Sequence, residues 1–109
     1  MTYDHELTLI KHEYPLDEYG NPQTDENGNQ IVIATETVVL CGLKSVSRNE
    51  FYSAAVNDLK PEHVFVVHGY EYDGQKIVEF EGIRYRTIRT YAVDFEEIEL
   101  ICEKVGADG

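Results

Sequence analysis

Hydrophobic and polar residues alternate along much of this chain, which is the pattern of half-buried β-strands. Residues 5–12 place Leu7 and Leu9 on one face and Thr8 and Ile10 on the other. The same reading predicts six strands. They are expected at residues 5–12, 30–46, 63–72, 75–80, 83–91 and 96–104.

In three of these segments the residue types also predict a bend or which side chains are buried. The long segment 30–46 is rich in β-branched residues, with Gly42 as the place for a bend. The run Val64–Val67 is apolar on both faces, so it predicts a strand buried from two sides. In the last segment Ile98, Leu100 and Cys102 are expected to point inward.

Turn residues indicate how the later strands connect. Asp73-Gly74 predicts a hairpin between the third and fourth strands, and Glu81-Gly82 predicts one between the fourth and fifth. The second half therefore reads as a meander. A sheet this small protects its edges best by closing on itself. We expect an all-β fold, a small closed or nearly closed barrel of about six strands.

A long polar segment separates the first two strands. Glu13–Gln30 contains two prolines, two glycines, three asparagines and five acids, without periodicity. Connections of this length are uncommon in compact domains and are often functional. We expect a loop or an extended hairpin tip. Its candidate contact residues are Asp17, Glu18, Tyr19, Asp25, Glu26 and Asn27.

Residues 45–61 are the one convincing helical segment, inserted between the second and third strands. Ser47 and Glu50 fit a capping box, Phe51 begins an apolar stripe at helical spacing, and Pro61 is expected to end the segment. Two interpretations stay open. The helix either plugs an open end of the barrel by burying Phe51, or presents Phe51 and Tyr52 to a neighbouring subunit.

Charge and length narrow the function. The 109 residues form a single domain, 1–109, with a net charge of -12. This charge disfavours binding to duplex nucleic acid, because such affinity comes from neutralising phosphates. It would also repel DNA that slides past. Without an apolar signal segment or a run long enough to span a bilayer, the chain is expected in a reducing cytosol with no membrane partner.

No pattern for catalysis or for a bound group stands out. Asp25, Asn27 and Asn29 resemble the start of a calcium loop, but the glycine comes too early, so an Asn-Gly turn is the better interpretation. The four histidines lack metal-ligand spacing, and Cys41 and Cys102 belong to no zinc motif and are expected in the core. We therefore expect a non-enzyme without metal or cofactor.

Basic residues concentrate on one predicted strand. Arg84, Arg86 and Arg89 lie within six positions of each other. They are expected either to pair across strands with Glu79, Glu81 or Glu99 of the same chain or to form ion pairs with an acidic neighbouring subunit.

The order of these segments resembles one known family. A strand ending in "CGLKSVS", then "NEFYSAA", then "EHVFVVHGYEYDGQKIVEFEGIRYRTIRTY" and "EEIELICEKVG" is similar to the phage head-tail joining proteins, the head-closure or stopper proteins of tailed-phage necks. The likeness covers about residues 38–106. The chain departs from the family pattern at Leu40-Cys41-Gly42, where an aromatic pair is common, and at His68, where arginine is common.

The resemblance implies a structural subunit that forms a ring, a hexamer or dodecamer of itself, in the virion neck. Such a ring assembles in the host bacterial cytoplasm, docks on head adaptor and portal proteins, and presents a surface to a tail completion or tail tube protein. Packaged DNA would pass its lumen without specific binding. The interface candidates are Glu50, Phe51, Tyr52, Arg84, Arg86 and Arg89.

Two other classes of function remain open from the sequence. An acidic DNA-mimic inhibitor of a nucleic-acid enzyme would need a continuous acidic face. A small ligand-binding barrel would need a lined internal pocket.

Overall fold

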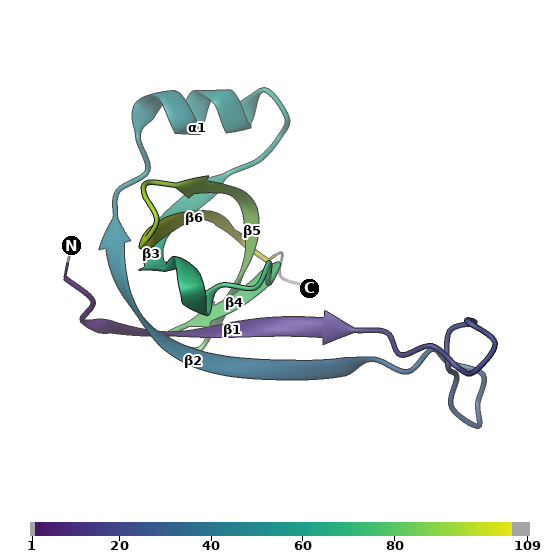
Figure 1. Ribbon diagram of the computed structural model, residues 1–109. Coiled ribbons are helices and arrows are strands. Elements are labelled where there is room, and N and C mark those ends of the chain that lie inside the picture. The colour runs from purple at the N-terminus through teal and green to yellow at the C-terminus, as the bar shows by residue number, and fades with distance from the viewer. Residues whose placement is uncertain (1, 106–109) are drawn as a thin grey trace.

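Six antiparallel strands close into a barrel in the computed structural model, which describes residues 2–105 (Figure 1). The strands are β1 (His5–Glu13), β2 (Ile33–Lys44), β3 (Pro61–His68), β4 (Ile77–Phe80), β5 (Ile83–Ala92) and β6 (Glu97–Lys104). Helix α1 (Arg48–Ala55) lies between β2 and β3 in the chain, and the short 3-10 helix η1 (Gly69–Glu71) follows β3. The predicted all-β barrel with one inserted helix is confirmed. Gly106, the end of the family-like segment, lies outside the described residues.

The barrel interior is filled by side chains. Alternate residues of the strands point inward, as the pleat of a β-strand requires. Phe65 at the centre is fully buried and packs against the rings of Phe80 and Tyr85. The other buried members of this core are Leu7, Leu9, Val39, Cys41, Val67, Val78, Leu100 and Cys102. Ile98 packs against them, so the predicted inward face of the last strand is confirmed.

One residue of the first strand was placed wrongly by the alternation pattern. Ile10, expected on the outer face, is only 2% exposed. It lies opposite Ile77 of β4, and the chain around Gln75, itself buried, borders the same place. The alternation of residue types assumes that the outer face of a strand is exposed to solvent. At Ile10, the neighbouring chain around Gln75 covers this face.

The predicted meander is wrong at its first connection. Asp73-Gly74 does not join β3 to β4 as a hairpin, because β3 pairs with β2 and β6 whereas β4 pairs with β1 and β5. The order around the barrel is β1-β2-β3-β6-β5-β4. The chain crosses from β3 to β4 through η1 and the turn at Gly74, and β4 then closes the barrel against β1.

The second predicted hairpin is confirmed. Glu81 and Gly82 connect β4 directly to β5 and have φ angles of 52° and 78°. Positive φ at both central residues is the requirement of a type I′ turn, whose twist matches that of the flanking strands.

β2 changes partner at the predicted bend. Residues Ile33–Cys41 pair with β1, and from Gly42 onward the strand pairs with β3. The first part of β2 and the end of β1 therefore extend beyond the barrel as a two-stranded arm, which points away from the barrel in Figure 1.

The helix does not plug the barrel. α1 lies outside the barrel wall, and Ala54 is its only buried residue (Figure 1). Phe51 is 45% exposed, so the interpretation that required its burial is wrong. The helix also ends before the predicted limit, because Asp58 adopts a left-handed conformation (φ 64°) and the amides of Asp58 and Leu59 bond back to the last turn.

Candidate functional site

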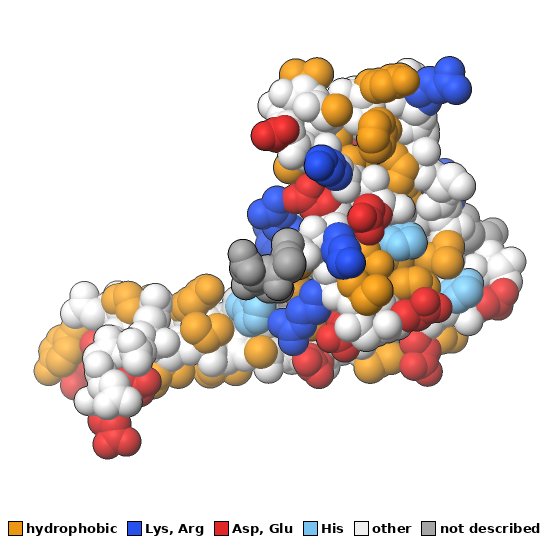
Figure 2. All heavy atoms as spheres, turned by 180° about the vertical axis from the view of Figure 1, so that it is seen from behind, with side chains coloured by type: hydrophobic (Ala, Val, Ile, Leu, Met, Phe, Trp, Pro, Cys, Tyr) orange, Lys and Arg blue, Asp and Glu red, His pale blue; other side chains and the backbone are white. Residues whose placement is uncertain are grey.

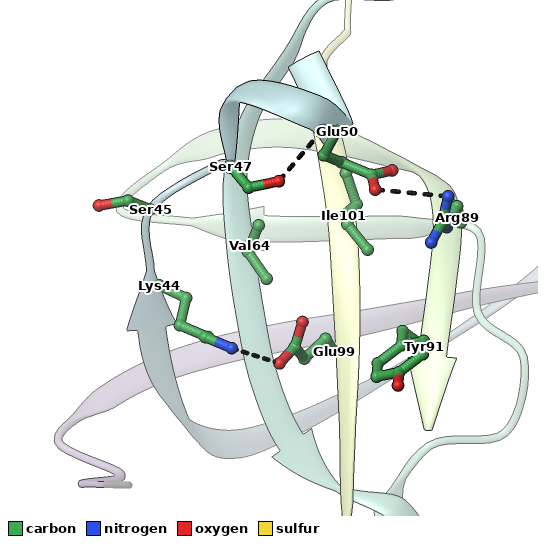
Figure 3. Close-up of a pocket in the computed structure, with 9 residues that line it drawn as sticks. All are labelled: Lys44, Ser45, Ser47, Glu50, Val64, Arg89, Tyr91, Glu99 and Ile101. Carbon is green, nitrogen blue, oxygen red and sulfur yellow. Dashed lines mark hydrogen bonds and ion pairs between the residues drawn. The ribbon is translucent and has the colours of Figure 1, made fainter. Parts of the chain in front are cut away.

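A groove runs between the N-terminal end of α1 and the outer face of the barrel (Figure 3). Val64 of β3 and Ile101 of β6 form its apolar floor, and both are buried although they point out of the barrel. This position explains the confirmed prediction that β3 is buried on two faces. Tyr91 of β5 borders the groove and is exposed.

Two ion pairs cross this groove. Lys44 Nζ lies 2.7 Å from Glu99 Oε2, and Arg89 Nη1 lies 3.3 Å from Glu50 Oε2. The hydrogen bond to Glu99 raises the pKa of Lys44. In both pairs the basic side chain is exposed and the glutamate is mostly covered, with 15% of the side chain exposed for Glu99 and 19% for Glu50.

Of the two hydrogen bonds expected for the capping box of α1, one is present. Ser47 Oγ accepts a hydrogen bond of 3.1 Å from the Glu50 amide, which caps α1. The Glu50 carboxylate, expected to return to the Ser47 amide, contacts Arg89 of β5 instead. This contact ties the first turn of the helix to the barrel.

The apolar side of α1 is largely open to solvent. Besides Phe51, Tyr52 and Val56 are exposed, and a second hollow beside Phe51 is bordered by Leu59 and Pro61. Figure 2 shows apolar side chains gathered around the protruding helix and on the projecting arm. An eight-residue helix is marginal by itself, so this exposed side is suited to gain further packing.

All three candidate arginines find partners within the chain. Arg84 Nε lies 3.6 Å from Glu79 on the neighbouring strand, Arg86 pairs with Glu103, and Arg89 pairs with Glu50. Pairing with Glu79 was one of the expectations. The partners of Arg86 and Arg89 were not predicted, because they depend on the register of β5 against β6, which shifts after Thr87, and on where α1 lies.

The carboxylate of Glu103 accepts hydrogen bonds from two groups, the Lys60 amide and the Arg86 guanidinium. Partial burial works to raise its pKa, but the Lys60 amide at 3.1 Å and the Arg86 guanidinium hold the pKa below its ordinary value. A depressed carboxyl pKa stabilises the fold above the unfolded pKa of about 4.3, and the contribution is lost as pH falls through the folded value.

Glu103→Gln is therefore expected to lower the free energy of unfolding at pH 7 by about 1 kcal/mol. The difference from the unsubstituted chain should disappear near pH 2. Urea unfolding at several pH values measures it, with Glu18→Gln on the exposed tip as the control that should change nothing. A difference that persists at pH 2 would contradict the assignment.

The long segment between β1 and β2 forms the tip of the arm, as two successive turns of one kind. The Asp17 Oδ1 atom accepts hydrogen bonds from the amides of Tyr19 and Asn21, each 2.9 Å long. Eight residues later, Asp25 Oδ1 makes the same two bonds to the amides at Asn27 and Asn29.

Gly20 and Gly28 have φ near +80° and complete the two turns. The sequence signal for these turns is the repeat Asp-Glu-x-Gly-Asn at 17–21 and 25–29. The repeat was missed because residues 13–30 lack the periodicity of a strand or a helix. The predicted turn at residues 25–30 is confirmed, since the Gly28 amide bonds to the Asp25 carbonyl and Asp25 Oδ1 accepts from the amides of Asn27 and Asn29.

The tip brings its candidate contact residues together at one end of the arm. Asp17 and Asp25 shape the turns, whereas Glu18, Tyr19, Glu26 and Asn27 occupy their exposed corners. The tip therefore presents two carboxylates and one ring that its own turns do not use.

The two cysteines are core residues, as predicted. Cys41 and Cys102 are both 0% exposed and unpaired. Burial raises the pKa of Cys41 to about 11 and that of Cys102 to about 12, so both remain thiols at neutral pH.

Within residues 2–105, no three His, Cys, Asp or Glu side chains come together as a metal site would require. In the same part of the chain, neither helical segment has the length and apolarity to cross a bilayer.

Sequence comparisons assign no relatives. A scan against protein-family models finds no match, and a search of curated proteins finds none either.

Proposed function

We propose that this chain is a non-enzymatic head-closure subunit of a tailed-phage neck. It forms a ring between the portal–adaptor complex and the tail, retains packaged DNA and offers the tail an attachment surface. The observation that carries the proposal is a filled barrel from which two elements project, the arm and α1, each with exposed apolar side chains. The segment order that resembles the head-tail joining family supplies the class of partner.

The filled interior favours a protein that works through its outer surface. Phe65, Leu7 and Leu100 occupy the space where a ligand-binding barrel of this size would hold its ligand. The exposed side chains of α1 and the arm offer packing area to protein neighbours instead.

Charge supports a conduit for DNA better than a DNA-binding surface. The net charge is -12, and five of the nine Lys and Arg residues are already paired with carboxylates of the same chain. A ring of such subunits would repel phosphates and let DNA slide. On the face shown in Figure 2, acidic side chains are scattered among apolar and basic ones, which does not favour a DNA mimic.

Light scattering coupled to size-exclusion chromatography tests the proposal. The chain is expected to co-elute with a purified portal–adaptor complex in a fixed stoichiometry. Phe51→Ala/Tyr52→Ala is expected to weaken this binding at least tenfold without unfolding the barrel. Phe95→Ala, a fully exposed aromatic at the β5–β6 turn, is the matched control and should bind normally. A strict monomer that ignores the complex yet binds a DNA-processing enzyme would overturn the proposal.

A further inference from the structure

One edge of β2 lacks a partner strand over most of its length. Ile33–Cys41 pairs with β1 on one side, and β3 covers the opposite edge only at Gly42–Lys44. Among the described residues, no strand pairs with the opposite edge of Ile33–Cys41. At roughly 3.4 Å per residue this free edge is about 30 Å long.

This edge has few of the usual devices that prevent strand addition. Natural edge strands carry lysine, proline or a bulge, or are short. Ile33–Cys41 contains neither lysine nor proline, keeps a continuous register with β1 and has Glu36 as its one charge. Apart from the buried Val39 and Cys41 its side chains are exposed, with Val38 63% and Leu40 52% exposed. Such an edge is suited to pairing with another strand.

The same chain contains a second free edge. β4 pairs with β5 only as far as Arg86, and one further bond runs from the Thr87 amide to Lys76. After a bulge at Ile88, residues 89–92 pair with β6 alone in the described part of the chain. This half of β5 includes Arg89 and the exposed Tyr91.

Charge favours joining these two different edges. The free half of β5 carries one charge, Arg89, which also contacts Glu50 of its own chain, and the free edge of β2 carries one charge, Glu36. Joining β5 of one copy to β2 of another brings unlike charges together. Joining β2 to β2 would place two acidic arms side by side and leave the β5 edge unpaired.

We propose that the free edge of β2, Ile33–Cys41, accepts residues 89–92 of β5 from a second copy of this chain, so that the sheets of neighbouring subunits become continuous. Each copy then gives one edge and accepts one. Contacts of this head-to-tail kind close into rings or extend as filaments. The inference rests on the ring proposed above and names the contact that holds it.

Cross-linking of two singly substituted proteins tests the pairing. Thr37→Cys lies on the free part of β2 and Thr90→Cys on the free part of β5, while native Cys41 and Cys102 are buried and remain silent. A short bis-maleimide tolerates a shift of register. At concentrations of several hundred micromolar the mixture is expected to give a cross-linked dimer, at least tenfold above either protein alone. Thr35→Cys, two residues before Thr37 on β2, is mixed with Thr90→Cys in a second test of the same pairing.

Two outcomes would overturn the inference. Efficient cross-linking of the Thr37→Cys protein by itself would indicate β2–β2 pairing, and no cross-link from any mixture of folded proteins would exclude the contact. Circular dichroism establishes that each variant is folded.

Hydrogen exchange on the unsubstituted chain gives an independent measurement. In the assembly with the portal–adaptor complex, alternate amides of Ile33–Cys41 should exchange at least tenfold more slowly than in the free chain. A ring whose β2 amides remain unprotected would overturn this inference and leave the proposed function standing. Cross-linking of the two cysteine variants without binding to the portal–adaptor complex would support the strand contact and contradict the proposed function.

Discussion

Replacing residues 14–32 with Asn-Gly is expected to abolish tail attachment or DNA retention while the barrel stays folded. Glu13 and Ile33 lie opposite each other at the end of the arm, so a two-residue type I′ turn can join them directly. The deleted residues make their hydrogen bonds mainly among themselves, as the two aspartate-centred turns show. The fold should therefore lose little stability, whereas the proposed ring would lose the arm tip of every subunit.

Plating of phage that carry the shortened gene, together with electron microscopy of their heads, measures this result. Infectious particles should fall by several orders of magnitude, with heads that are empty or tailless. The control is Glu18→Gln/Glu26→Gln, which removes two charges and keeps both turns. Loss of infectivity in the control as well would assign the effect to charge, and full infectivity of the shortened phage would remove the tip from the mechanism.

Phe65→Ala is expected to cost about 3–5 kcal/mol of unfolding free energy, the usual range for a fully buried aromatic. Phe65 is 0% exposed and lies against Phe80, Tyr85 and His63 at the centre of the barrel. A domain of this size has a total stability of roughly 5–15 kcal/mol, so the variant should be close to unfolding at 37 °C.

Phe51→Ala is the matched control, because it removes the same side chain from the exposed face of α1. Its expected cost is below about 1 kcal/mol. Urea unfolding monitored by circular dichroism measures both values. Equal losses would show that Phe51 supports the fold, and would contradict its assignment to a subunit interface.

The strands and the hairpin between β4 and β5 could be predicted from sequence because their causes are local. Alternation placed Leu7, Leu9, Leu100 and Cys102 in the core, and Glu81-Gly82 specified its turn through backbone conformation alone. The cap of α1 was equally local, since Ser47 needs only the amide three residues ahead.

The candidate site could be predicted only in part. Exposure of Phe51 and Tyr52 agrees with an interface, but the groove under the helix was not foreseen, because its floor of Val64 and Ile101 comes from strands far apart in sequence. The tip of an extended hairpin was one of the expectations for residues 13–30, and the pairing of β1 with β2 up to Glu13 and Ile33 agrees with it. The two turns within the tip were not predicted, although the repeat Asp-Glu-x-Gly-Asn indicates them.

By itself, the sequence determined which residues form strands, where the chain turns and how strongly it repels phosphate. Tertiary structure alone decided that β3 neighbours β6, that β4 closes on β1, that α1 remains outside the wall and that one edge of β2 stays open. The physical reason is that strand pairing is chosen by burial and closure of the whole sheet. Burial and closure of the sheet depend on all six strands together, whereas a turn or a helix cap depends on a few neighbouring residues.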